Sequence, residues 1–149
     1  MSMRSKFRAS AAGSVDEVEA AFYEALQRGD IDMLMRCWAD DDEVFCVHPG
    51  SVRVVGPSAI RVTFERIFAH GVLHVKPVKL RKVDTLTSAV HSVLERIEMM
   101  RTDGLQQAYV LATNVYHRTP QGWRMVAHHA SPAVARELGE MHEETVVLH

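Results

Sequence analysis

The stretch that decides the fold lies near the C-terminus and reads TNVYHRT at positions 113–119 and GWRMVAHHAS at positions 122–131. Both halves are rich in residues that favour strands, and the short Pro120-Gln121-Gly122 turn between them predicts a β-hairpin. Side chains alternate between the two faces of a strand, so His129 and Ser131 are expected on one face of the sheet. Because that sheet must otherwise bury apolar residues, a polar cluster on it indicates a lined cavity.

Helix signals dominate the first half of the chain. Ser14 and Glu17 have the spacing of a capping box, and Gly29 suits the end of the helix that they begin. Pro57 is tolerated at the first position of a later helix, on which Phe64 and neighbouring apolar residues form a buried stripe. Three helices are therefore expected, from Ser14 to Gly29, from Asp30 through an apolar stripe that ends at Trp38, and from Pro57 to Gly71.

Strand signals dominate the rest. A strand over 43–48 ends at Pro49-Gly50, a short strand over 52–55 pairs with it, and a last helical turn begins at Ser131-Pro132. Helices early and strands late predict an α+β domain with the helices packed on one face of a curved antiparallel sheet, which leaves an open end for a ligand. The long strands are expected over 73–83, 89–100, 107–118 and 123–130, as an antiparallel meander.

Length and composition indicate one globular domain. The chain has 149 residues, of which 47% are apolar and 24% charged, and we expect a flexible arm over 1–13 followed by a single domain over 14–149. A net charge of −2 argues against nucleic acid or an anionic membrane as a partner, because both need a concentrated basic face. Only two cysteines, Cys37 and Cys46, argue for buried free thiols and a cytoplasmic protein.

Several separated motifs occur in a characteristic order. They are Trp38 before Asp40-Asp41-Asp42, the strand end His48-Pro49-Gly50, the helix start Gly56-Pro57-Ser58-Ala59-Ile60, and the terminal GWRMVAHHAS segment. This order resembles the SnoaL-like branch of the nuclear transport factor 2 superfamily over nearly the whole chain after Ser14. The resemblance implies a cone-shaped, cystatin-like α+β barrel with a deep pocket, usually a homodimer through the outer face of its sheet.

The resemblance also implies where chemistry is expected. The superfamily includes ketosteroid isomerases, polyketide cyclases, dehydratases, and members that only bind or assemble. Ketosteroid isomerase places an aspartate base before a proline at a strand end, where this chain has His48 before Pro49. Imidazole titrates near neutrality, so His48 is expected to transfer protons. The family's terminal-strand pattern implies that His129 faces the cavity and that His128 faces solvent or a dimer partner.

The candidate site residues follow from face and chemistry. Asn114 and Tyr116 share one face of their strand and offer an amide and a hydroxyl to a bound carbonyl. The alternatives are a strand-end His48 bonded to a carbonyl, a core His129 satisfied by Asn114, and a Trp38 that only packs. We expect His48, His129 and Asn114 to be catalytic, and Trp38, Tyr23, Phe64, Phe68, Tyr116 and Ser131 to line a ligand pocket.

These residues support three hypotheses about function. The first is a pocket protein that binds a small, largely apolar molecule, as a cofactor-free isomerase, cyclase or dehydratase that transfers a proton next to a carbonyl. The second is a ligand-binding or dimerisation module without catalysis. The third is a metal site formed by His48 and His129 across the cavity. No phosphate-binding loop or serine-elbow motif occurs in the sequence.

Overall fold

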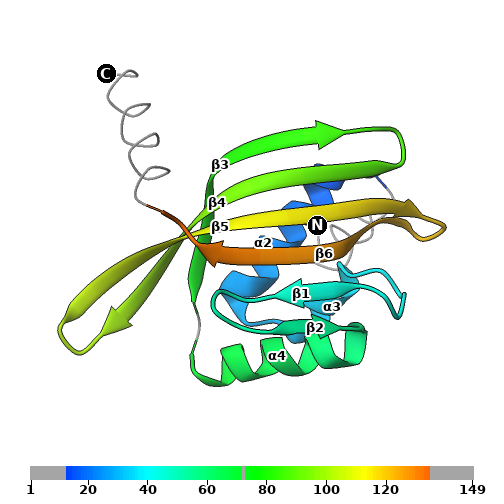
Figure 1. Ribbon diagram of the computed structural model, residues 1–149. Coiled ribbons are helices and arrows are strands. Elements are labelled where there is room, and N and C mark those ends of the chain that lie inside the picture. The colour runs from blue at the N-terminus through cyan, green and yellow to red at the C-terminus, as the bar shows by residue number, and fades with distance from the viewer. Residues whose placement is uncertain (1–12, 72, 135–149) are drawn as a thin grey trace, which may run out of the picture.

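The computed structural model describes residues 13–71 and 73–134, in which three helices pack against one six-stranded sheet (Figure 1). The expected order of elements is confirmed, whereas most of the N-terminal arm, residue 72 and residues 135–149 lie outside the described residues. The elements are α2 (Val15–Arg28), α3 (Ile31–Arg36), β1 (Phe45–Val47), β2 (Arg53–Val55), α4 (Pro57–Ala69), β3 (His74–Asp84), β4 (Ser88–Arg101), β5 (Gly104–Thr119) and β6 (Gly122–Pro132).

Local capping chemistry sets the ends of α2. The side chain of Ser14 accepts a hydrogen bond from the backbone N–H of Glu17 at 3.2 Å, as a capping box requires. Gly29 ends the helix with φ 64°, a left-handed conformation in which glycine meets no Cβ penalty. The expected boundaries are therefore confirmed, and they fix which face of α2 turns toward the sheet.

The segment after α3 differs from the expectation. The helix ends at Arg36, and Trp38 lies beyond it in a parallel bridge with Met125 of β6. The carbonyl of Cys37 accepts from the Met125 N–H at 2.7 Å, and the N–H of Ala39 donates to the Met125 carbonyl at 2.9 Å. The expected helical stripe through Trp38 is therefore wrong, because the chain leaves the helix there to pair with the sheet.

The sheet is curved and unclosed, with β2 and β3 at its edges. Its strand order is β2-β1-β6-β5-β4-β3, and α2 and α3 cover one face while α4 packs beside β1 and β2 (Figure 1). All neighbouring strands are antiparallel except β1 and β6, which pair in parallel with Cys46 opposite His128. The expectation of a wholly antiparallel sheet is corrected at this one pair.

A β-bulge in β6 decides which histidine faces inward. Val115 pairs with Ala127 and Tyr116 pairs with Met125, so Val126 has no partner on β5. One extra residue shifts the alternation of side chains by one position. Met125 therefore keeps the inward position that a regular strand predicts, whereas the residues after Val126 face the opposite way from that prediction.

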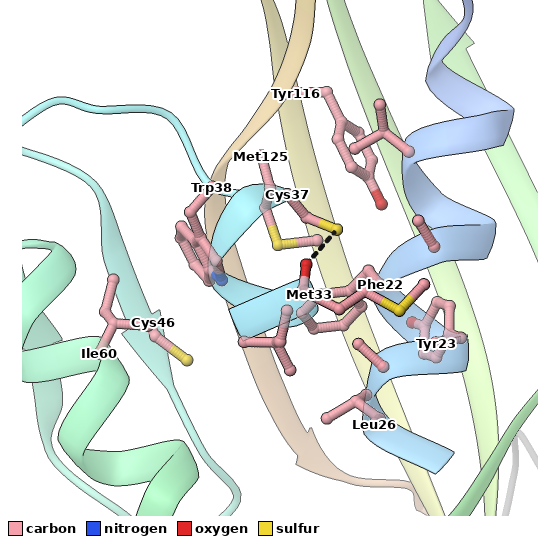
Figure 2. Close-up of a cluster of buried hydrophobic side chains, with 14 of the residues drawn as sticks. Phe22, Tyr23, Leu26, Met33, Cys37, Trp38, Cys46, Ile60, Tyr116 and Met125 are labelled. Atoms are coloured by element: carbon pink, nitrogen blue, oxygen red, sulfur yellow. Dashed lines mark hydrogen bonds between the residues drawn. The ribbon is translucent and has the colours of Figure 1, made fainter. Parts of the chain in front are cut away.

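The interior between helices and sheet is filled by one large apolar cluster. Figure 2 shows side chains of α2 and α3 meeting Met125 of β6, with Cys37 donating to the carbonyl of Met33 at 3.6 Å. None of the helices in the described ranges has the length and apolar character that a membrane crossing requires. Ser131 and Pro132 belong to β6, so the expectation that a helical turn begins at these two residues is wrong.

Candidate active site

Two polar side chains project from the buried face of α2 toward the sheet. Glu19 and Tyr23 are four residues apart, which places them one above the other on the same face of a helix. They are 5% and 3% exposed, although the rest of that face is apolar. Buried polar groups need partners, and both side chains find them on β4 and β5.

Tyr23 bonds to a carboxyl group that is also buried. Its hydroxyl donates to Glu95 Oε2 of β4 at 2.6 Å and accepts from Asn114 Nδ2 of β5 at 3.0 Å. Burial raises the pKa of Glu95 to about 7, the nearby charge of Glu19 adds to this, and the Tyr23 hydrogen bond opposes it. Burial also raises the pKa of Tyr23. Glu95 is therefore a carboxyl group able to hold or release a proton near neutral pH.

Asn114 joins this pair to His128. Its Oδ1 lies 2.6 Å from His128 Nδ1, and both side chains are buried on the inner face of the sheet. Burial lowers the pKa of His128 to about 3, and the neighbouring His48 and His129 act in the same direction. His128 is therefore neutral at physiological pH.

Glu19 forms a second set of contacts beside the first. Its Oε2 accepts from the Tyr116 hydroxyl at 2.5 Å and from Asn114 Nδ2 at 3.3 Å, and its Oε1 lies 2.9 Å from His91 Nδ1. The other ring nitrogen of His91 lies 3.0 Å from Asp84 Oδ1, on a side chain that is 42% exposed. This branch connects the buried groups with the protein surface.

His48 lies at the other end of a row of aromatic rings. It is half-buried just after β1, with Nε2 3.1 Å from Thr63 Oγ1 and its ring edge-on to Phe64 at 4.9 Å. Phe64 lies 6.2 Å from Phe22, which in turn lies 5.3 Å from His128. Burial lowers the pKa of His48. His48 and His128 thus lie at the two ends of an aromatic wall, the row formed by the rings of Phe64 and Phe22.

An open groove reaches the two polar residues of α2. It has a volume of about 320 Å³ and lies between α2 and β3. An exposed ion pair joins its two sides, because Lys82 Nζ lies 2.8 Å from Asp16 Oδ1. The groove is lined by Asp16, Glu19, Ala20, Tyr23, Pro77, Leu80 and Lys82. A small molecule in it would therefore contact Glu19 and Tyr23.

The structure corrects the expected orientation of the histidine pair. His129 and Ser131 are exposed, whereas His128 is buried beside Asn114. The reason is the bulge at Val126, which reverses the alternation that places His129 inside. His129 cannot meet His48 across the interior, so the expected metal site between them is wrong as well.

The other expected residues lie close to where the sequence places them. Tyr23, Asn114, Tyr116 and Phe64 are buried, and Phe68 is half-buried with its ring 6.3 Å from that of Phe64. Trp38 is buried, and its indole N–H has no partner. Within residues 13–71 and 73–134, no group of three or more His, Cys, Asp or Glu side chains is placed to hold a metal ion.

Three buried ionisable residues were not expected from the sequence, namely Glu19, His91 and Glu95. A signal for two of them was present. Glu19 interrupts an apolar helix stripe, and Glu95 occupies an inward position of β4 between Val93 and Ile97. A charged residue on a face that is otherwise apolar indicates a buried partner, but it does not say which one.

Known proteins are similar to this chain over most of its length. The sequence model of the family described as the SnoaL-like domain matches residues 15–135. A Streptomyces avermitilis structure, described provisionally as a dehydratase of the NTF2-like family, is 31% identical, with TM-score 0.73 over 81% of this chain and 95% of its own. The chain has no match among the curated proteins.

Two further solved structures carry names that concern assembly. One, from Thiobacillus denitrificans, is described provisionally as a calcium/calmodulin-dependent protein kinase type II association domain. It is 32% identical, with TM-score 0.73 over 83% of this chain and 98% of its own. The S. rosetta CaMKII hub is 20% identical, with TM-score 0.66 over 82% of this chain and 96% of its own, which shows a shared fold.

Proposed function

The chain belongs to the SnoaL-like domain family, and from this membership we propose that the groove between α2 and β3 binds a small, largely apolar molecule, and that the protein transfers a proton next to a carbonyl group of that molecule without a cofactor. Ala20, Pro77 and Leu80 line this groove and supply apolar contact for such a molecule. The groove between α2 and β3 supplies a route to Tyr23. The provisional dehydratase description of the Streptomyces avermitilis protein agrees with this class of reaction.

The observation that carries the proposal is the Tyr23–Glu95 pair. Glu95 has a pKa raised to about 7 by burial, and Tyr23 donates to it at 2.6 Å. A general base works best when its pKa lies near the working pH. In the proposed step, the Glu95 carboxylate takes a proton from the carbon beside the carbonyl and becomes neutral. The Tyr23 hydroxyl then turns its one hydrogen from Glu95 to the enolate oxygen that forms.

His48 remains a second candidate for the base. Its ring contacts Phe64 at the far end of the aromatic wall, and Thr63 lies within hydrogen-bonding distance. Burial lowers its pKa, which keeps the imidazole unprotonated but also makes it a weaker base. Glu95 is favoured because its pKa is shifted toward neutrality.

Exchange of hydrogen for deuterium tests the proposal without a known substrate. A graded series of cyclic ketones is incubated with the protein in D2O, and NMR follows loss of the proton signal beside the carbonyl. The wild-type protein is expected to accelerate exchange for at least one ketone. Glu95→Gln, which keeps the shape but cannot take the proton, is expected to lose about 10²–10⁴-fold of that rate.

Two control variants separate the candidates. Glu24→Gln lies on an exposed part of α2, with its side chain 44% exposed, and should retain the wild-type rate. His48→Ala should retain most of it if Glu95 is the base. Loss of exchange in His48→Ala with full activity in Glu95→Gln would move the role to His48. A wild-type protein that accelerates exchange for none of the ketones would contradict proton transfer.

A second candidate function is self-association through the outer face of the sheet. Val83 and Val90 pair on neighbouring strands of this face and are 71% and 39% exposed. Exposed apolar side chains that lie together often mark an interface. The association-domain description of the Thiobacillus denitrificans protein supports this candidate.

Light scattering after gel filtration tests this second function. A homodimer is expected for the wild-type protein, and Val90→Lys should shift it toward the monomer because a buried unpaired charge opposes association. Val62→Lys is the matched control, since Val62 is 43% exposed on α4 and lies outside the sheet. A monomeric wild-type protein would contradict assembly.

The state of the cysteines supports a cytoplasmic location. Cys37 and Cys46 are both buried and unpaired. Burial raises the pKa of each thiol to about 12, so both stay protonated and unreactive. Free thiols of this kind suit a reducing compartment, and we include the cytoplasm in the proposal on that basis.

A further inference from the structure

The orientation of one buried amide links the two halves of the polar cluster. Asn114 is fully buried, and its side chain contacts Glu19, Tyr23 and His128. An asparagine amide has a donor end and an acceptor end, and rotating it by half a turn exchanges them. Which end faces which neighbour therefore decides where hydrogen atoms lie around it.

Glu19 distinguishes the two ends of the amide. A carboxylate oxygen only accepts hydrogen bonds, so the group facing Glu19 Oε2 at 3.3 Å must be the NH2 end of Asn114. The same NH2 group donates to the Tyr23 hydroxyl at 3.0 Å, which in turn donates to Glu95. With the NH2 end held on this side, the amide oxygen faces the other way.

That oxygen meets a ring nitrogen of His128. Oδ1 of Asn114 lies 2.6 Å from Nδ1, and two acceptors cannot share a contact this short without a hydrogen between them. Nδ1 must therefore carry the hydrogen, which leaves the lone pair of a neutral imidazole on Nε2. We propose that Glu19, held in place by His91, sets the tautomer of His128 through Asn114, so that Nε2 is a hydrogen-bond acceptor.

His91 is well placed to hold Glu19. Its Nδ1 lies 2.9 Å from Glu19 Oε1, and its Nε2 lies 3.0 Å from Asp84 Oδ1. The hydroxyl of Tyr116 donates to the other Glu19 oxygen at 2.5 Å. Both oxygens of Glu19 therefore have hydrogen-bond partners in fixed directions, and the side chain has little freedom to turn away from Asn114. Glu19 and His91 are positioning residues in this arrangement.

The assigned tautomer indicates which chemical group of a ligand His128 would bind. The contact between His128 and Asn114 uses Nδ1, and Phe22 packs against the ring at 5.3 Å. A lone pair beside an apolar wall suits a hydroxyl group on an otherwise apolar molecule. This consequence rests on the proposed function, whereas the tautomer itself is a property of the protein alone.

Nitrogen-15 NMR of the histidine side chains tests the tautomer on the intact protein without a ligand. In the wild-type protein at neutral pH, His128 is expected to give one neutral form, with the hydrogen on Nδ1 and an unprotonated Nε2. A hydrogen on Nε2, or an even mixture of the two forms, would overturn the proposal. Because this measurement needs no variant, it holds even where a substitution prevents folding.

Matched variants then test the control by Glu19. Glu19→Leu removes the acceptor, so the amide of Asn114 can rotate and the single-tautomer signal of His128 should be lost. Glu19→Gln keeps an acceptor oxygen for the Asn114 NH2 group and should restore that signal. Glu24→Leu makes the same change on an exposed part of the same helix and should leave the signal unchanged. A folded Glu19→Leu protein with the wild-type signal would show that Glu19 does not set the tautomer.

The outcomes separate this inference from the proposed function. The wild-type tautomer together with no deuterium exchange on any ketone would sustain the positioning role and contradict proton transfer. Deuterium exchange that depends on Glu95, together with a hydrogen on His128 Nε2, would support proton transfer and contradict the positioning role of Glu19. The two measurements use different residues and different readouts, so neither result can stand in for the other.

Discussion

Tyr23 and Glu95 are 72 residues apart in the chain, yet the tyrosine hydroxyl donates to the carboxylate at 2.6 Å inside the protein. The contact joins α2 to β4 and leaves the carboxyl group almost without water. Water normally stabilises the charged form of a carboxyl group, so its removal raises the pKa, and one hydroxyl donor offsets only part of that loss. The result is a group whose charge changes near neutrality, which makes stability and activity sensitive to pH in the same range.

Glu95 should therefore make the folded state less stable as pH rises. Its pKa is about 7 in the folded protein against a usual 4.5, so its stabilising contribution is complete below pH 4.5 and is lost as pH rises through 7. Urea unfolding gives the free energy of unfolding of the wild-type protein and of Glu95→Gln. Between pH 4.5 and 7, the wild-type value should fall relative to that of the variant by up to about 1.4 kcal/mol per pH unit. Above the window the difference should be constant. A constant difference across the whole range would contradict the raised pKa.

His128 should produce the opposite dependence on the acid side. Its pKa falls from 6.5 to about 3 on folding, so its contribution is present above pH 6.5 and is lost as pH falls toward 3. His128→Gln keeps a donor for Asn114 but cannot take up a proton. Between pH 6.5 and 5, the wild-type protein should lose stability relative to this variant, by up to about 1.4 kcal/mol per pH unit. Equal losses in the two proteins would mean that His128 is protonated in the folded state.

The parts of the fold that depend on local chemistry could be predicted from the sequence. Ser14 and Gly29 mark the ends of α2, and the structure confirms both, because a cap needs only its own turn of backbone. The turn around Gly122 likewise follows from residues adjacent in the chain. The β1–β6 pair could not be predicted in the same way, since Cys46 and His128 come from opposite ends of the domain.

The candidate site could be predicted only in part, for a related reason. Asn114 and Tyr116 lie inside as expected, because β5 is regular there. The orientation of the histidine pair depends on the bulge at Val126. This bulge accompanies the hydrogen bonds that Met125 makes with the segment after α3. A pattern with a period of two contains no sign of an unpaired residue. The partners of Glu19 are equally invisible, since Tyr116 is 97 residues away.

The hydroxyl of Tyr116 should contribute measurably to stability. It donates to a buried carboxylate of Glu19 at 2.5 Å, and hydrogen bonds to charged groups contribute about 1.5–3 kcal/mol. Tyr116→Phe should lower the unfolding free energy by that amount in urea titrations at pH 7. Tyr109→Phe is the matched control in the same strand, where the side chain is only half-buried, and a change within about 0.5 kcal/mol is expected. Equal effects of the two substitutions would show that the Glu19 contact adds nothing.

Removing the Tyr23 hydroxyl should raise the pKa of Glu95 further. The hydrogen bond from Tyr23 lowers that pKa, in opposition to the effect of burial, so Tyr23→Phe leaves burial less opposed. The measurement is the pH above which the stability difference between each protein and its Glu95→Gln counterpart becomes constant. In the Tyr23→Phe background this pH should lie higher than in the wild-type background, where it is about 7. Tyr109→Phe, made in the same way, should leave it in place. An unchanged or lower value with Tyr23→Phe would mean that the hydroxyl does not stabilise the Glu95 charge, and the role given to this pair in proton transfer would lose its physical basis.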